Sequence, residues 1–161
     1  VGLDLNREPI DLRDVVNASI QALLPVCEDK NIQIGSETPD KPVEVLGDRE
    51  ALYQTINNLL DNAIKYNSIN GTASVHLRKE NGNAVIDVQD TGIGIKPLEQ
   101  HRIFERFYRV DKARSRQLGG TGLGLSIVKH TILAHGGQLS VESLPGVGST
   151  FQISIPLIKS S

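Results

Sequence analysis

The sequence predicts an α+β protein in which three helices cover one face of a mixed sheet of about five strands. Apolar residues recur at helical spacing in three places, at about residues 11–27, 48–66 and 122–134. Residues 73–90 and 138–156 each contain two stretches separated by a short turn rich in Asn, Gly or Pro, which is typical of a β-hairpin. Together these patterns indicate a two-layer α/β sandwich.

The composition is that of one ordinary globular domain. The chain has 161 residues, of which 39% are hydrophobic and 22% charged, so it is long enough to bury a core. A net charge of −2 gives no basis for general attraction to nucleic acid or anionic lipid. These residues contain no apolar run long enough to cross a bilayer, and we expect no signal peptide among them. The chain begins with Val1 and contains no Met, which suggests a piece of a longer protein.

The sequence of the N-terminal third of the chain predicts one helix and up to three short strands. Residues 3–10 form either a short strand or a linker. Asp11 then caps a helix that we expect Pro25 to kink near its end. Residues 31–35 and 43–46 predict two short strands around a Pro-containing turn.

The second predicted helix, from about Asp48 to Tyr66, carries a polar stripe opposite its apolar face. Asn58, Asn62 and Lys65 follow one another along this stripe, and Tyr66 ends it. A solvated surface would explain polar residues, but Asn is a poor helix former, and Glu, Lys or Gln would suit such a surface better. Amide oxygens can bind a hard cation such as Mg²⁺, and a Lys can bind phosphate. We therefore expect a ligand along this stripe.

A single carboxylate is predicted at the end of a buried strand. In the stretch AVIDVQDTGIGI, Asp90 shares strand parity with Ile86 and Val88 and therefore faces the core. A buried carboxylate needs hydrogen-bond donors, since leaving it unpaired is costly. Gly92 and Gly94 follow at once and allow either a tight turn or the close approach of a ligand.

A glycine-rich stretch, GGTGLGLSIVKH at residues 119–130, precedes the third predicted helix. It is not a Walker loop, because Leu125 and Ser126 follow its last glycine where that motif has Lys and then Ser or Thr. Its G-x-G-x-G spacing also differs from the dinucleotide fingerprint G-x-G-x-x-G. Two interpretations remain at this point: backbone N–H groups that bind an anion at a helix N-terminus, or a flexible loop.

Four segments of the chain together resemble the motifs of one known family. They are NLLDNAIKY at residues 58–66, DTGIGI at residues 90–95, IFERFYR at residues 103–109 and GTGLGL at residues 120–125. Their identity and order resemble the N, G1, F and G2 boxes of the catalytic, ATP-binding domain of bacterial sensor histidine kinases. The resemblance covers almost the whole chain.

The resemblance implies the Bergerat ATP-binding fold of the GHKL group, which agrees with the predicted sandwich. Residues 1–8 would be the tail of the connection from a missing dimerisation domain that carries the phosphoacceptor His. Residues 9–158 would be the ATP-binding catalytic domain, and residues 96–121 would form an ATP lid within it.

The resemblance also implies roles for individual residues. Asn62 would bind the Mg²⁺ ion that bridges the phosphates of ATP, Asn58 would line the phosphate side, and Lys65 would contact phosphate, so that these three are the catalytic set. Tyr66 would pack beside the adenine, and Asp90 would accept a hydrogen bond from its amino group. The other ATP-binding residues implied are Gly92, Gly94, Ile95, Phe107, Arg109, Gly120, Thr121, Gly122, Leu123, Gly124, Leu125 and Thr150.

In this interpretation the glycine-rich stretch is part of the lid over the triphosphate. Backbone N–H groups of residues 122–125, at the start of the third helix, would face the phosphates. Thr150 would reach the adenine through water. Phe107 would help to anchor the lid, and cations such as Arg109 would meet phosphate.

The activity implied is transfer of the γ-phosphoryl group of ATP to a His on the separate dimerisation domain, followed downstream by a response regulator. The four histidines of this chain lie outside the family's acceptor context, so we expect that the fragment does not autophosphorylate alone. We also expect a monomeric domain, because dimerisation in this family rests on the missing domain. We expect this domain to be cytoplasmic and without membrane contact, because most proteins of the family carry it in the cytoplasm.

Three alternatives remain open. ATPases and serine kinases share this fold, but several use a Glu one turn before the Mg²⁺-binding Asn, where this chain has Asn58, which cannot take a proton. A degenerate domain could hold nucleotide, or none, and act by docking a partner. The basic and aromatic residues 102–116 could bind nucleic acid, although we expect none.

Overall fold

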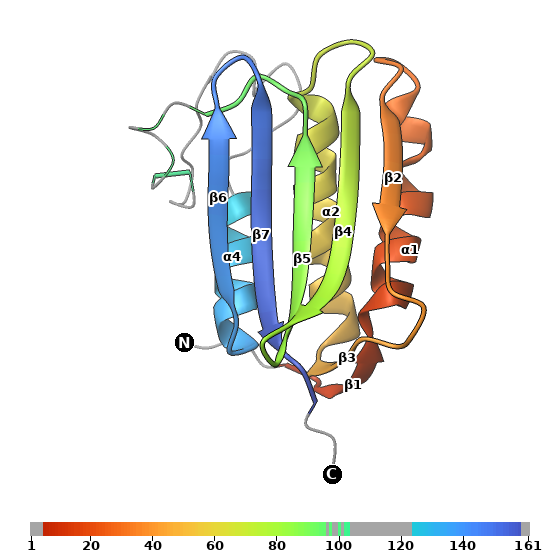
Figure 1. The fold of residues 1–161 in the computed structure, drawn as a ribbon, viewed down its shortest axis with the longest axis vertical. Coiled ribbons are helices and arrows are strands. Elements are labelled where there is room, and N and C mark those ends of the chain that lie inside the picture. Colours follow the sequence, from red (N-terminus) through yellow and green to blue (C-terminus); the bar gives the residue numbers. More distant parts are fainter. Residues whose placement is uncertain (1–4, 96, 98–99, 101, 104–123, 159–161) are drawn as a thin grey trace.

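The computed structural model describes residues 5–95, 97, 100, 102–103 and 124–158, which form two layers (Figure 1). One layer is a five-stranded sheet, and the other contains three helices that lie behind the sheet in this view. The strands of the sheet are β2 (Gln33–Glu37), β4 (Thr72–Glu80), β5 (Asn83–Asp90), β6 (Gln138–Leu144) and β7 (Gly148–Pro156). The helices are α1 (Leu12–Leu23), α2 (Arg49–Lys65) and α4 (Gly124–Ala134). The predicted α+β sandwich is thereby confirmed.

The sheet is mixed, as predicted. Its strand order is β2-β4-β5-β7-β6; β2 runs parallel to β4, and all other neighbours are antiparallel. The two predicted hairpins are β4–β5 and β6–β7, and the last strand, β7, lies between β5 and β6. A parallel pair needs a long crossover, and the chain between β2 and β4 supplies it with α2.

A second, two-stranded sheet was not predicted. Strand β1 (Glu8–Asp11) pairs antiparallel with β3 (Glu44–Gly47), so the stretch expected as a strand or a linker is a strand. The two short strands expected at residues 31–35 and 43–46 therefore join different sheets. The first of them begins later than predicted, because the chain still turns at Asn31, whose φ is 52°.

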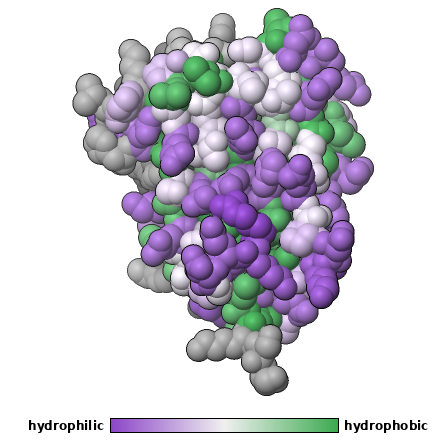
Figure 2. Space-filling model, viewed as in Figure 1, coloured by the Kyte–Doolittle hydropathy of each residue, from purple (hydrophilic) through white to green (hydrophobic). Residues whose placement is uncertain are grey.

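The core lies between the helices and the sheet. Helix α2 is central, because it packs against α1, α4 and the strands β4 and β5. The opposite face of the sheet is polar, and Figure 2 shows hydrophilic side chains gathered there. On that face Asp87 accepts hydrogen bonds from Arg78 and from Gln152. The helices therefore cover only one face of the sheet, and the core lies between that face and the helices.

Pro25 ends the first helix instead of kinking it. Helix α1 stops at Leu23, and Pro25 begins a separate 3-10 turn, Pro25–Cys27. Proline lacks the N–H that would continue the helix, but it is tolerated at the start of a new one. Cys27, the last residue of this turn, is buried, and burial raises the pKa of its thiol. It belongs to the hydrophobic core.

The first described residues are tied to the ends of two helices. The carboxylate of Asp48 caps α2 by accepting from the N–H of Ala51 (3.1 Å), and it also accepts from the N–H of Asn6 (3.0 Å). The guanidinium of Arg7 donates to the carbonyl of Ala134 at the end of α4 (2.7 Å). His135 accepts from the N–H of Asp48 (3.1 Å). Segment, helix cap and helix end thus form one hydrogen-bonded unit.

We expect Asp48→Ala to lower the free energy of unfolding by about 1 kcal/mol at neutral pH, because a helix cap is lost. The N–H groups of Ala51 and Asn6 hold the pKa of Asp48 below its usual value. Its contribution is therefore present above the unfolded-state pKa and is lost as the pH falls through the lowered pKa. Urea unfolding at several pH values should show the difference from wild type shrinking in acid. Asp29→Ala, at an exposed turn residue, is the control, and an equal loss in both variants would contradict the expectation.

Candidate functional site

The polar stripe predicted on the second helix is present along one side of α2. Asn58, Asn62, Lys65 and Tyr66 are each partly exposed, whereas the apolar side of the helix is buried. The side chains of Asn58 and Asn62 lie one helical turn apart, and the stripe leads to Tyr66, which caps the C-terminal end of α2. The two amide groups therefore lie in a line that leads to the C-terminal end of α2.

Lys65 makes an ion pair within the helix. Its Nζ lies 3.0 Å from a carboxylate oxygen of Asp61, and the two side chains are 33% and 32% exposed. Because solvent screens such a pair, exchanging Asp61 for another anion costs little. The ammonium of Lys65, at the end of the stripe, can therefore exchange its partner Asp61 for another anion such as phosphate.

Asp90 is the last residue of β5 and lies on the core side, in phase with the buried Ile86 and Val88. Burial raises the pKa of its carboxyl, and the backbone N–H groups of Gly92 and Ser149 oppose this by donating to it. The Gly92 bond is 2.8 Å long. A carboxylate can accept about four hydrogen bonds, so capacity remains for a donor of a ligand.

The loop after β5 lies directly against the end of α2. Asn67 and Gly92 form an antiparallel bridge, and the N–H of Ile93 donates to the carbonyl of Tyr66 (3.1 Å). Gly92 is buried, and a Cβ placed on it would lie 2.5 Å from the carbonyl oxygen of Tyr66. The predicted stripe and the predicted carboxylate therefore meet at one corner, at the upper end of the sandwich in Figure 1.

The other side of this loop is fixed to the β6–β7 turn. Gly94 has a φ of 71°, and a Cβ on it would lie 2.1 Å from the carbonyl oxygen of Leu144. The N–H of Gly146 donates to the carbonyl of Ile93 (2.8 Å), and the N–H of Ile95 donates to the hydroxyl of Ser143 (2.7 Å). Both glycines allow a close approach of protein backbone, and the approach of a ligand to them stays a prediction.

Ser149, and not the predicted Thr150, lies beside Asp90. Ser149 is the cross-strand partner of Asp90, whereas Thr150 is the partner of Gln89. Since successive residues of a strand point to opposite faces, Thr150 lies on the outer face of the sheet, where it lines a cavity of about 260 Å³ together with Gln89. The structure does not bring Thr150 to the Asp90 corner.

The predicted lid lies almost entirely outside the described residues. This applies to Phe107, Arg109, Gly120, Thr121, Gly122 and Leu123. Gly124 is the first residue of α4, and the partly buried Leu125 packs against the core. At the beginning of the predicted lid, the side chain of Gln100 donates to the carbonyls of Ile95 (2.9 Å) and Ser143 (3.0 Å).

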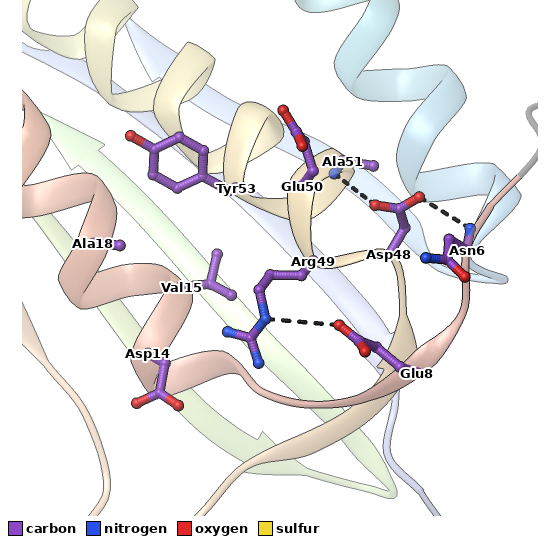
Figure 3. A pocket seen from close by; sticks show the side chains of 10 residues that line it. All are labelled: Asn6, Glu8, Asp14, Val15, Ala18, Asp48, Arg49, Glu50, Ala51 and Tyr53. Carbon is purple, nitrogen blue, oxygen red and sulfur yellow. Dashed lines mark hydrogen bonds and ion pairs between the residues drawn. The ribbon is translucent and has the colours of Figure 1, made fainter.

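A cavity of about 750 Å³ lies at the other end of α2, next to the N-terminus of α1 (Figure 3). Four carboxylate residues line it, Glu8, Asp14, Asp48 and Glu50, against the single cation of Arg49. The Nε atom of Arg49 lies 3.8 Å from the carboxylate oxygen Oε1 of Glu8. This charge does not suit a triphosphate, so the cavity is not a competing site for an anionic nucleotide.

Two other features are absent from the part of the chain that the structure describes. No three His, Cys, Asp or Glu side chains in these residues are grouped so that they could hold a metal ion. None of the described helices has the length and the apolar character that spanning a bilayer requires. A metal at the α2 stripe would therefore depend on amide oxygens and on the oxygens of its own ligand.

Comparison with known proteins agrees with this architecture. Residues 47–159 match the family described as histidine kinase-, DNA gyrase B- and HSP90-like ATPase. The chain is 47% identical over 150 residues to the sensor-like histidine kinase SenX3 of Mycolicibacterium smegmatis, a match that covers 92% of this chain and 38% of that protein. It is 37% identical over 153 residues to the sensor histidine kinase WalK of Bacillus subtilis, covering 94% of this chain and 25% of WalK.

Solved structures show the same likeness. The mycobacterial sensor histidine kinase MprB matches with a TM-score of 0.82 and 33% identity, over 96% of this chain and 99% of that one. Full-length ShkA in complex with AMPPNP matches with a TM-score of 0.86 and 27% identity, over all of this chain and 33% of ShkA. The chain therefore belongs to the histidine kinase-, DNA gyrase B- and HSP90-like ATPase family, and within it to the ATP-binding catalytic domains of two-component sensor histidine kinases. It spans well under half the length of SenX3 and WalK.

Two residues of the corner were missed by sequence reasoning. Strand parity could have identified Ser149, because it is in phase with the apolar residues Phe151 and Ile153 and therefore faces the core side with Asp90. Asn67 is 1% exposed and hydrogen-bonded on several sides. In the sequence it is only one more polar residue after a helix, because its partners are set by the tertiary fold.

We expect Gly94→Ala to destabilise the domain more than Gly82→Ala does. Both glycines have positive φ, so both substitutions carry a backbone penalty of about 1–2 kcal/mol. A Cβ at Gly94 also meets the carbonyl of Leu144, whereas a Cβ at Gly82 has nothing within 4 Å. Urea unfolding of the two variants measures the difference, and equal losses would mean that the loop moves away from the β6–β7 turn without cost.

We expect the carboxyl of Asp90 to titrate above its usual pKa, because it is partly buried and desolvation disfavours its charged form. A raised pKa in the folded state means that stability is fully present below the unfolded-state pKa and declines as the pH rises through the folded-state value. The stability of Asp90→Asn relative to wild type should therefore increase from acidic to neutral pH. Carbon NMR of the carboxyl group gives the pKa directly, and a midpoint below that of a model Asp would contradict the assignment.

Proposed function

We propose that the Asp90 corner binds the adenine of ATP and that the domain presents the γ-phosphate to a His on a separate dimerisation domain. The observation that supports this most is the meeting of Asp90, held by two backbone N–H groups, with the polar end of α2. Asp90 would accept a hydrogen bond from the adenine amino group. Gly92, Gly94 and Ile95 would border the base, since they form the loop between Asp90 and the β6–β7 turn.

We assign the role expected of Thr150 to Ser149. Ser149 is the cross-strand partner of Asp90, and its hydroxyl lies 2.7 Å from the hydroxyl of Ser143. A water between Ser149, Asp90 and the base would complete the recognition of adenine. Tyr66 would pack beside the base, since it follows the last turn of α2 at the same corner.

The phosphates would lie along the stripe of α2. A Mg²⁺ ion there would neutralise phosphate charge, and the amide oxygen of Asn62 suits such a hard cation. Asn58 would line the phosphate side one turn earlier. Lys65 would leave its exposed ion pair with Asp61 for a phosphate oxygen.

The lid would close over the triphosphate. Backbone N–H groups of residues 122–125, at the start of α4, would donate to phosphate, with Gly120 and Thr121 leading into them. Arg109 would add a cation, and Phe107 would anchor the lid to the domain. These roles rest on the motif resemblance, since most of the lid lies outside the described residues.

Phosphoryl transfer demands positioning and charge neutralisation from the protein. Asn58 has no proton-accepting group, which favours transfer to an imidazole over hydrolysis by a general base. The related proteins are likewise named as sensor histidine kinases, which disfavours an ATPase, a serine kinase or a docking module. The partners would be the protein's own dimerisation domain and, downstream, a response regulator. The isolated domain would be monomeric and cytoplasmic, and would bind neither nucleic acid nor membrane.

Calorimetric titration with a non-hydrolysable ATP analogue, with and without Mg²⁺, tests the proposal. We expect saturable binding that Asp90→Asn weakens by about 10- to 100-fold, because a hydrogen bond to a charged acceptor is lost. Asp29→Asn makes the same chemical change at an exposed turn and should bind as wild type does. Asn62→Ala should abolish the effect of Mg²⁺. Absence of binding to the folded wild type, or equal binding by Asp90→Asn, would refute the proposal.

A further inference from the structure

Asn67, directly after the C-cap of α2, uses its whole carboxamide inside the protein. The residue is 1% exposed. Its Nδ2 donates to the carbonyl of Thr72 (2.9 Å), and its Oδ1 accepts from the N–H of Ser68 (2.8 Å) and from the hydroxyl of Thr91 (3.2 Å). One side chain thereby joins the end of α2, the first residue of β4 and the loop after β5.

Thr91 forms a hydrogen-bonded triangle with Asn67 and Thr72. Its hydroxyl accepts from the N–H of Thr72 (2.9 Å) while it donates to Asn67, and its own N–H donates to the carbonyl of Thr72 (3.2 Å). The carboxamide of Asn67 and the hydroxyl of Thr91 thus each have partners of the correct kind. Space is also restricted, because a Cβ on Gly71 would lie 2.1 Å from Oδ1 of Asn67.

The backbone of Asn67 is held as well. It forms the bridge to Gly92, and its carbonyl accepts from the ammonium of Lys30 (3.2 Å), which also donates to the carbonyl of Lys65. The turn after α1 therefore secures the end of α2 from one side, and the carboxamide of Asn67 secures the loop from the other.

We infer that Asn67 is a positioning residue of the nucleotide site, which fixes the loop Thr91–Gly94 and with it the carboxylate of Asp90 relative to the α2 stripe. The inference rests on the proposed function insofar as this loop binds the base. A loop that is already ordered binds more tightly, because binding does not have to order it. Removing the carboxamide leaves the hydroxyl of Thr91 with only its longer hydrogen bond, to the carbonyl of Thr72 (3.5 Å), and loosens the loop without removing any group proposed to touch nucleotide.

The experiment compares Asn67→Ala, Thr91→Val and the double variant with wild type. Titration with ADP and with the ATP analogue gives Kd, and hydrogen exchange gives the protection of the Ile93 amide, which donates to Tyr66. Val45→Ala is the control for general loss of stability, since Val45 is buried in β3, outside the corner.

We expect Asn67→Ala to weaken both nucleotides by a similar factor, about ten-fold, and to accelerate exchange at Ile93. Thr91→Val should act in the same direction, and the double variant should lose less than the two single losses combined, because both belong to one triangle. Val45→Ala should lower the melting temperature while binding and Ile93 exchange stay near the wild-type values.

Unchanged binding and exchange in Asn67→Ala would overturn the inference, as would fully additive losses in the double variant or an equal loss of binding in Val45→Ala. Exchange at Ile93 requires no nucleotide. A wild type that does not bind ATP would therefore refute the proposed function, while the exchange rates of the variants would still decide whether Asn67 positions the loop.

Discussion

The contact on which the site depends is the backbone pairing between the end of α2 and the loop after β5. One bridge, Asn67 with Gly92, and one hydrogen bond, from Ile93 to Tyr66, join two segments that are about 25 residues apart. Without this pairing the stripe of amides and the buried carboxylate would be unrelated features of a helix and a strand. With it, a helix that presents two amides and a lysine and a strand that ends in a carboxylate border the same space.

The pairing is possible because the core fixes both of its partners. The apolar side of α2 is buried against β4 and β5, so the polar stripe has to face outward along the helix. Strand alternation places Asp90 on the core side, where burial raises its pKa and two N–H groups moderate that effect. The acceptor is thus kept partly dehydrated, which strengthens any hydrogen bond that a ligand donates to it.

Sequence patterns were sufficient for whatever is governed by local periodicity or by a motif. The helices, both hairpins and the position of Asp90 follow from spacings of 3.6 and 2 residues, and the family resemblance predicted the ATP-binding fold. Interactions between distant segments were not predictable in this way. The pairing of β1 with β3 and the buried partners of Asn67 depend on the tertiary fold. The structure pairs Asp90 with Ser149 and not with Thr150, and a shift of one residue along a strand places a side chain on the other face of the sheet.

The place of β7 in the sheet has a consequence for how the chain folds. This last strand inserts between β5 and β6 instead of adding to an edge. During synthesis the ribosome must therefore release residues up to Pro156 before the sheet can close, and until then β5 presents an unpaired edge. Formation of the corner beside Ser149 has to wait for the same event, so that Asp90 gains its neighbour across the sheet only when β7 has emerged.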